Sequence, residues 1–436
     1  MTPTLAASGR ATWFDLGRHA VRWALPASLQ AIMQNGLLDK TFQDALVPEF
    51  LFPRTADSMP WQGGLGDTKT FTRKGLLAPA TTAITGSDAS AATYAVEQYS
   101  VTMDQYGQAI DTNMLTSSMS LASKFLADVQ TLGINAGQSV NQICRGKLFA
   151  AYAGGRSWAT AGTSSSTSLV VQSVNGFGTV LSNGVPVPVS GATPLSITIG
   201  GVANTVTGVN TSTNTLTLGT AATVAAGAAV VAATAPVTIR ATGANSAYDL
   251  TSSNLATFAM FRSAVARLRK ANVPTIGGCY VAHIDPDTEA ELFSDADFKQ
   301  ALQGRVDSEV FRDLSIGRFG GIDWVRNNET PTLLGGSSGN LTVHRPIVMG
   351  ANALIAAPFE GMGSLLAGTG VEDVPDIQMI DAAPGVQVAR IVRPPQDRLQ
   401  QILSTSWSYV GDFGVPSDAL VGDAAMFKRA VVLEHA

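Results

Sequence analysis

A serine flanked by glycines is the first position at which this sequence could do chemistry. Residues 335 to 339 read Gly-Gly-Ser-Ser-Gly and match the G-x-S-x-G pattern, in which Ser337 would be the nucleophile of an esterase. That pattern requires a buried strand before the serine and a helix after it. The residues that follow, Asn-Leu-Thr-Val-His-Arg-Pro, have no helical period and favour a surface loop. We therefore expect no catalytic residues, and a serine esterase using Ser337 stays as an alternative function.

A histidine and two carboxylates form the second candidate. His283, Asp285 and Asp287 alternate at the end of an apolar run, and side chains in this arrangement can coordinate a metal ion. Asp285 has a sufficient role as a helix N-cap, because Pro286 follows it at the first helical position. No second histidine lies nearby, and the sequence has neither a P-loop nor a well-placed G-x-G-x-x-G. We expect no metal site and no cofactor.

The overall charge disfavours a protein that grips nucleic acid. The 436 residues carry a net charge of −5, whereas proteins that bind DNA electrostatically are usually basic. Mild acidity suits a protein that lies beside packed DNA without adhering to it. The two cysteines, Cys144 and Cys279, form no disulfide framework and indicate a reducing compartment. The first 20 residues lack the basic and apolar segments of a signal peptide.

A long neutral segment divides the chain. Residues 157 to 239 contain no Asp, Glu, Lys, Arg or His. Short runs rich in Val, Ile, Leu and Thr alternate there with turn signals such as Asn-Gly and Gly-Gly, which predicts a small all-β barrel or sandwich inserted into a host fold. The most apolar part, residues 221 to 235, is too short for a membrane span, so we expect none.

The rest of the chain predicts an arm, a hairpin and an α/β unit. The two extended runs at residues 66–75 and 92–112 predict a long β-hairpin that is marginal without a neighbour. Apolar residues at steps of three and four predict a long helix over 117–153. Beyond the neutral segment we expect helices at 252–272 and from 285, and single strands at 278–284, 317–327 and 347–359. A closing hairpin is expected at 385–411, with its turn at residues 394–397.

Some residues are candidates for contacts between subunits. Trp61 lies beside two glycines at the hairpin base and could anchor an interface, although a core position is equally expected. Five basic residues belong most simply on solvated faces, and in a subunit that tiles a closed surface they could instead pair with carboxylates of neighbours: Arg73, Lys74, Arg390, Arg393 and Arg398. Glycine pairs are candidate hinges: Gly63 and Gly64, Gly154 and Gly155, Gly320 and Gly321.

This order of parts resembles the major capsid proteins of tailed bacteriophages. The residues 70–115 look like the extended loop of that family, the helix 117–153 like its spine helix, and the residues 268–295 followed by Ile-Gly-Arg-Phe-Gly-Gly-Ile like its axial domain. The resemblance implies an α+β phage major capsid fold with an inserted all-β domain. It divides the chain into an N-terminal arm (1–55), an extended loop (56–112), a peripheral domain (113–155), the insert (156–241), an axial domain (242–383) and a return to the peripheral domain (384–436).

The resemblance also implies a structural function. Copies would form pentamers and hexamers that close into an icosahedral shell around double-stranded DNA, located in the virion and assembled in the host bacterial cytoplasm. The implied partners are a separate scaffolding protein, a portal and a possible decoration protein, with no membrane and no sequence-specific DNA contact. Two alternatives stay open besides the esterase: an encapsulin-like shell around protein cargo, and a fibre or adhesin, which the α/β remainder disfavours.

Overall fold

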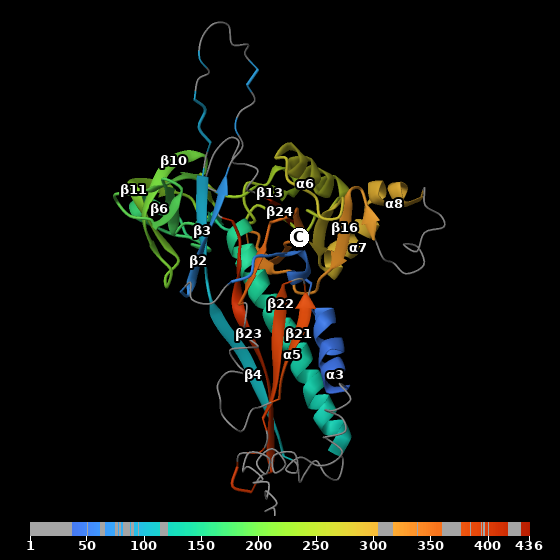
Figure 1. The fold of residues 1–436 in the computed structure, drawn as a ribbon. Coiled ribbons are helices and arrows are strands. Elements are labelled where there is room, and N and C mark those ends of the chain that lie inside the picture. Colours follow the sequence, from blue (N-terminus) through green and yellow to red (C-terminus); the bar gives the residue numbers. More distant parts are fainter. Residues whose placement is uncertain are drawn as a thin grey trace, which may run out of the picture.

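The computed structural model describes residues 37–49, 51–61, 66–74, 77, 80–81, 88, 91–94, 96–113, 121–303, 317–337, 339–359, 376–383, 385–393, 395, 397–399, 401–416 and 429–436. Most of the predicted arm and the pair Gly63–Gly64 therefore lie outside the described residues. The rest is a mixed α+β chain with three sheets of six strands each and shorter hairpins (Figure 1). Short 3-10 turns complete it at Val47–Glu49, Pro53–Thr55 and Ala241–Gly243.

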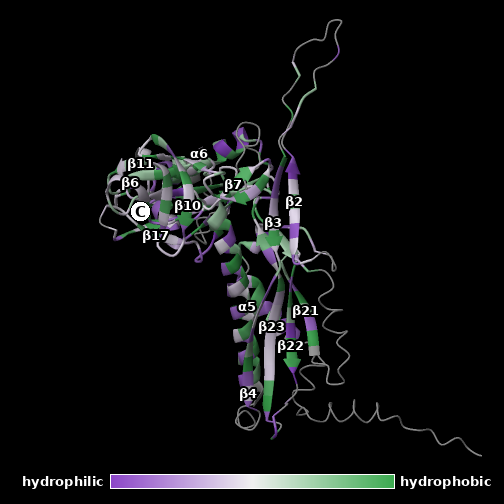
Figure 2. Cartoon of the chain, turned by 90° about the vertical axis from the view of Figure 1, so that its left-hand side faces the viewer, coloured by the Kyte–Doolittle hydropathy of each residue, from purple (hydrophilic) through white to green (hydrophobic). Residues whose placement is uncertain are grey.

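The long sheet and the spine helix form the largest core. Its strands are β1 (Asp57–Ser58), β20 (Ile355–Pro358), β23 (Ile402–Gly414), β22 (Val386–Arg393) and β21 (Asp376–Ala383), with β4 (Asp104–Asn113) paired to β23. Helix α5 (Leu121–Tyr152) lies along this sheet and buries the predicted apolar face, including Phe125, Val129 and Val140 (Figures 1 and 2). The predicted spine helix is thus confirmed for the described residues.

Two glycines inside α5 exist because another helix crosses there. Helix α3 (Leu37–Leu46) packs on α5, and a Cβ added at Gly133 would lie 2.9 Å from the carbonyl oxygen of Phe42. A Cβ at Gly137 would lie 2.9 Å from the carbonyl oxygen of Leu46. The two glycines lower helix propensity by roughly 1 kcal/mol each. The close approach of α3 that they permit buries Phe42 and Leu46 completely.

The extended hairpin is confirmed at its base. Strands β2 (Thr68–Lys74) and β3 (Val96–Thr102) pair antiparallel over seven residue pairs and form a two-stranded sheet of their own. The chain then passes from β3 into β4, which joins the long sheet through ten pairs with β23. The hairpin is therefore a projection from one edge of the long sheet (Figures 1 and 2).

The neutral segment folds into a barrel. Six strands follow the order β5-β12-β9-β10-β11-β6. The outer strands meet, because Gln172 N donates to Trp158 O at 3.1 Å and Ala159 bridges Val171. Their bounds are Arg156–Trp158 (β5), Thr163–Val170 (β6), Leu195–Ile199 (β9), Val202–Asn210 (β10), Thr215–Val224 (β11) and Ala229–Ala232 (β12), with a side hairpin of Thr179–Ser182 (β7) and Val185–Pro188 (β8). The barrel has its own apolar core, built around Leu169, Phe177 and Leu216.

The small sheet carries helices on one face. Its order is β13-β24-β19-β14-β16-β15, and β14 (Tyr280–Ile284), which lies within the strand predicted at 278–284, is buried along its whole length. Alternate β14 residues belong to two cores: Val281 faces the core of the spine helix, whereas Tyr280, Ala282 and Ile284 pack under the helices. The remaining bounds are Thr238–Arg240 (β13), Arg318–Phe319 (β15), Ile322–Arg326 (β16), Ile347–Met349 (β19), Ala430–Glu434 (β24), Phe258–Lys270 (α6), Pro286–Ser294 (α7) and Ala296–Gln303 (α8), and a separate hairpin pairs Thr332–Gly335 (β17) with Leu341–His344 (β18).

Several sequence-based boundaries are wrong. The run 347–359 is two strands in different sheets, because the chain turns at Asn352, whose φ is +57°. After the small sheet, the chain therefore returns to the long sheet at β20 rather than after residue 383, and β24 goes back to the small sheet. Residues 238–240 pair with β24 and not with the barrel. The run 317–327 is a hairpin, and α6 begins at Phe258, which leaves Leu255 45% exposed.

Candidate functional site

Ser337 lies in a hairpin turn. Strand β17 ends at Gly335 and β18 begins at Leu341, so a strand rather than a helix follows the serine. The turn uses Gly336 and Gly339, both with positive φ, and the Gly339 amide donates to the Gly336 carbonyl at 3.1 Å. The strand–turn–helix geometry that exposes an esterase nucleophile is therefore replaced by a strand–turn–strand.

His283, Asp285 and Asp287 do not converge on one point. The His283 ring is fully buried, with its centroid 4.5 Å from that of Phe52, and Asn327 Nδ2 donates to its Nδ1 at 3.4 Å. Burial lowers the pKa of His283 to about 3, so the ring is neutral. Asp285 occupies the N-cap position of α7, as predicted, but its carboxylate makes no cap hydrogen bond and is engaged by side chains instead.

Asp285 belongs to a buried polar cluster that the sequence did not reveal. Its two oxygens contact the Thr288 hydroxyl and His344 Nδ1. The Thr288 oxygen lies 2.7 Å from His435 Nε2, and His435 Nδ1 lies 2.9 Å from Glu291 Oε2. The two histidine rings stack with their centroids 5.3 Å apart. Nothing local in the sequence signals this cluster, because its members come from α7, from β18 and from the residue after β24.

The charges within this cluster stabilise one another. The bond to Asp285 raises the pKa of His344, although burial opposes the shift. Burial alone would raise the pKa of Asp285, but the bonds from His344 and Thr288 outweigh it and lower that pKa. Glu291 follows the same pattern, with its pKa lowered by the bond from His435 against the effect of burial. The cluster therefore holds the C-terminal strand β24 and its last residues against α7.

Asp285, Asp287 and His344 could in principle share a cation. Their ligand atoms lie within 4.8 Å of one another, and two carboxylates with an imidazole suit a divalent metal. Both oxygens of Asp285 and the Nδ1 of His344 are already used in hydrogen bonds, and Asp287 is 75% exposed. The observed bonding thus gives these groups a structural role without a metal.

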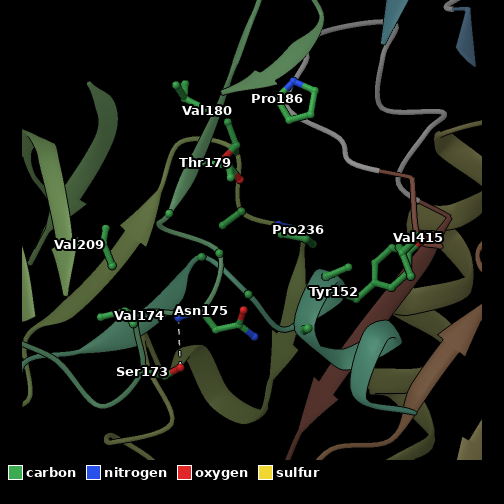
Figure 3. A pocket seen from close by; sticks show the side chains of 18 of the residues that line it. Tyr152, Ser173, Val174, Asn175, Thr179, Val180, Pro186, Val209, Pro236 and Val415 are labelled. Carbon is green, nitrogen blue, oxygen red and sulfur yellow. Dashed lines mark hydrogen bonds between the residues drawn. The ribbon is translucent and has the colours of Figure 1, made fainter. Parts of the chain in front are cut away.

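The clearest cavity lies where the barrel joins the spine helix (Figure 3). It has a volume of about 620 Å3 and is lined by Tyr152 at the end of α5, by barrel residues such as Val174 and Val209, by Thr179 and Pro186 of the side hairpin, and by Val415. None of its lining residues is charged. The cavity therefore offers no acid or base for catalysis, and it marks a domain junction.

The predicted contact residues divide into internal and exposed ones. Trp61 is 1% exposed and packs with Val101 and Ala357, so its own chain covers it. Arg73 Nη2 donates to the carbonyl of Asn352 at 2.7 Å, which ties the hairpin to the turn between β19 and β20. Lys74, Arg393 and Arg398 are exposed and stay predictions as contact residues. The solvated position expected for Arg390 is wrong: it is 1% exposed and pairs with Asp39 at 2.6 Å.

The glycine pairs that the structure describes lie in close-packed positions. Gly154 and Gly155 end α5, and both backbone groups of Gly155 bond to the barrel, its amide to Asn175 O and its carbonyl to the amide of Ala232, each at 2.8 Å. Gly320 and Gly321 form the tight turn between β15 and β16, with φ of +63° and +82°. Hinge motion at these pairs stays a prediction, and each pair has a sufficient local reason to be glycine.

Exposed apolar side chains gather at two projecting places. On and beside the extended hairpin, Leu77, Tyr94 and Val96 are 52%, 46% and 39% exposed. Next to the turn between β22 and β23, Leu399 and Ile402 are 72% and 40% exposed. The first place lies on a two-stranded hairpin that cannot bury both of its own faces, and the second lies at the end of the long sheet, where β22 and β4 flank β23. Within the described residues, no helix is long and apolar enough to cross a membrane.

Comparisons with known proteins give low-identity similarities to solved structures. No protein-family model matches the chain, and neither does any curated protein. The chain is similar to the capsid of Ralstonia phage GP4, with 14% identity, a TM-score of 0.47 and 87% of each chain covered. It is also similar to the cyanophage Pam1 capsid, with 12% identity, a TM-score of 0.47 and coverage of 90% of this chain and 92% of the other. For the capsid of cyanophage P-SCSP1u the identity is 11%, the TM-score is 0.46, and 89% of this chain and 88% of the other are covered. At these values the matches carry no functional argument, which has to come from the chain's own geometry.

Proposed function

We propose that this chain is a shell-forming subunit, the major capsid protein of a tailed bacteriophage. The observation that carries the proposal is the β2–β3 hairpin, a two-stranded projection whose large apolar side chains Leu77, Tyr94 and Val96 are exposed. Such a hairpin is marginal alone and gains stability when another surface covers it. A second copy of the chain is the partner that a self-assembling shell provides.

The internal contacts of the hairpin fit this function. The base is fixed to the body by the Trp61 cluster and by Arg73, whereas the described residues beyond the base, such as Leu77 and Tyr94, are exposed. Because its base is fixed, the hairpin should leave the body of the subunit in the same direction in every copy, where its exposed residues can meet a neighbour. Burial of apolar surface contributes about 25 cal/mol per Å2, so contacts repeated around a ring can outweigh the ordering entropy of the segments involved.

The finer features of the proposal follow from the resemblance described above. Pentamers and hexamers would close into an icosahedral shell around double-stranded DNA, in the virion, with assembly in the host bacterial cytoplasm. A separate scaffolding protein, a portal and a decoration protein would be its partners. The hairpin turn at Ser337 and the uncharged cavity support a structural role rather than an enzymatic one.

Assembly of the purified chain tests this proposal. We expect closed shells by negative-stain electron microscopy and fast sedimentation for the wild type. The variant Leu77→Asn with Tyr94→Asn should stay as free subunits, because its hairpin loses the apolar side chains that a neighbour would cover. Val202→Asn is the matched control, since Val202 is 71% exposed and belongs to β10 of the barrel rather than to the β2–β3 hairpin. A wild-type chain that stays monomeric at high concentration, or normal shells from the hairpin variant, would overturn the proposal.

A further inference from the structure

The last turn of α6 presents positive charge to solvent. Arg267, Arg269 and Lys270 are exposed there, and Arg262 is exposed one to two turns earlier. Within the described part of the chain, none of the four forms an ion pair. Cations at a helix C-terminus gain about 0.3–1 kcal/mol each from the helix dipole, and this explains why basic residues occur at this position. The dipole does not supply a carboxylate partner for them. We call Arg267, Arg269 and Lys270 the basic edge.

Negative charge lies at the other end of the same unit. Helix α7 begins two residues after β14 and carries Asp287 and Glu289 in its first turn. Asp287 is 75% exposed, and the nearest cationic group that the structure gives it is His344 Nε2, at 3.9 Å. Glu289 is paired with Arg326 at 2.6 Å. We call the exposed surface of α7 around Asp287 the acidic edge.

The two edges lie at opposite ends of β14. The basic edge is tied to the start of β14, because Val273 N donates to Leu268 O at 3.0 Å and the Tyr280 hydroxyl donates to Val273 O at 2.9 Å. The acidic edge follows the end of β14. A five-residue strand separates them by roughly 16 Å. In Figure 1, α6 lies above β13 and β24, and α7 lies below β16.

We propose that the basic edge of one copy of this chain docks on the acidic edge of the next copy, head to tail. Different patches at opposite ends of one rigid unit make a heterologous contact, which closes into a ring when the rotation between copies is right. The inference rests on the proposed function, because it names the partner for this part of the shell subunit. A second copy is favoured over nucleic acid because this unit carries the complementary charge itself and the whole chain has a net charge of −5.

The contact is weak singly and acts through repetition. An exposed ion pair contributes about 0.2–1 kcal/mol, and like charges placed opposite each other are unfavourable by a similar amount. Each copy in a ring makes the contact twice, once with each edge. Reversing one edge should therefore raise the concentration at which shells appear on the order of tenfold, while the fold of the subunit stays the same.

A charge swap within one chain tests the pairing. The basic-edge variant is Arg267→Glu with Lys270→Glu, and the acidic-edge variant is Asp287→Lys with Ala290→Lys, since Ala290 is exposed on the same helix. Each variant alone should assemble poorly, and the chain that carries all four substitutions should recover to within about threefold of the wild type. The control Lys40→Glu with Lys124→Glu changes the net charge as much as the basic-edge variant does, at exposed positions on α3 and α5, and should assemble normally.

The outcomes separate this inference from the proposed function. Thermal unfolding of the free subunits should stay cooperative in every variant, with only the small loss that reversed charges at the ends of α6 and α7 cause through the helix dipole, about 0.3–1 kcal/mol per site. The chain with all four substitutions carries the largest such loss and is still expected to assemble, which excludes misfolding as the cause of an assembly defect. If the wild type forms shells and the single-edge variants form them equally well, the docking inference fails and the proposed function stands. A basic-edge variant that assembles normally but retains less DNA would assign the basic edge to nucleic acid and would also overturn the inference. A wild type that never assembles would instead remove the proposed function.

Discussion

At the scale of single residues, two histidines near the end of β14 should respond to acid in opposite ways. His283 is fully buried beside Phe52, and its pKa is lowered to about 3 from an ordinary value of 6.5. A lowered histidine pKa stabilises the folded state above pH 6.5, and this contribution is lost as the pH falls from 6.5 towards 3. The loss is about 1.4 kcal/mol per pH unit for one proton. The variant His283→Gln should therefore show a shallower loss of unfolding free energy between pH 6.5 and pH 4, measured by denaturant titration of the free subunit.

His344 is the control for this prediction, because its contribution to folding stability should change with pH in the opposite direction. Its pKa is raised by Asp285, so its contribution is present below pH 6.5 and is lost as the pH rises through the raised value. The lowered pKa of Asp285 keeps the carboxylate ionised until well into the acid range. His344→Gln should thus lose about 1–2 kcal/mol more at pH 5 than at pH 9. Identical pH profiles for the His283 and His344 variants would contradict both assignments.

Only part of this arrangement of side chains can be predicted from the sequence. Asp285 was predicted as an N-cap because its local neighbours, Pro286 above all, define that position. Its partners His344 and His435 were not predicted, because β18 and the end of β24 are brought to α7 only by the tertiary fold. The sequence predicts a core position and an interface anchor equally for Trp61, and only the packing of Val101 and Ala357 against it shows that its own chain buries it.

At the scale of elements, the barrel acts on the extended hairpin. The side hairpin β7–β8 turns at Asn183 and Gly184, both with positive φ, and the Gly184 carbonyl accepts a bond from the Gln98 amide of β3 at 2.9 Å. A Cβ added at Gly184 would lie 2.3 Å from the carbonyl oxygen of Val96. The side hairpin is therefore a brace that sets the angle at which the extended hairpin leaves the body.

A single glycine substitution should release this brace. Gly184→Val should separate β8 from β3 and increase amide hydrogen exchange in β3, at Gln98 first, by about tenfold or more. Gly201→Val is the matched control, because Gly201 lies in another barrel turn with φ of +88° and a Cβ there meets nothing within 4 Å. Both variants carry similar backbone strain, and only the first touches the extended hairpin. Equal exchange in β3 for both variants would show that the side hairpin exerts no control.

The elements themselves were predicted better than their pairing. The periodic runs of α5 and β14 carry their signal within a single window of sequence, and the structure confirms them, together with the base of the extended hairpin and the pairing of β22 with β23. The second half of the run 92–112 is instead β4, which pairs with β23. Sheet membership has no such local signal. Strand β13 looks like its neighbours in the neutral segment, yet it pairs with β24, nearly 200 residues away. The same holds for β19 and β20, which read as one apolar run and belong to two sheets.

At the scale of the whole molecule, the barrel is an insertion whose two ends lie side by side. Arg156 Nε donates to the carbonyl of Pro236 at 2.8 Å, at the point where the chain enters and leaves the barrel. The barrel core shares no residue with the core of the spine helix or with that under α6. Trp158 is a link to the body, because it packs with Ala247, Leu250 and Val343.

Excision of the barrel should therefore leave a folded body. We expect a chain in which a short Gly-Ser linker replaces residues 157–235 to unfold cooperatively, with a loss of about 2–4 kcal/mol from the missing Trp158 contact. A chain that keeps the barrel and carries Trp158→Ala should show a similar loss, which separates the effect of that contact from the effect of the barrel. The excised chain should also show fast amide exchange in β3, because the brace is gone. If its unfolding is not cooperative, or the helix content of α5 is lost in circular dichroism, then the barrel is part of the body's core and not an insertion.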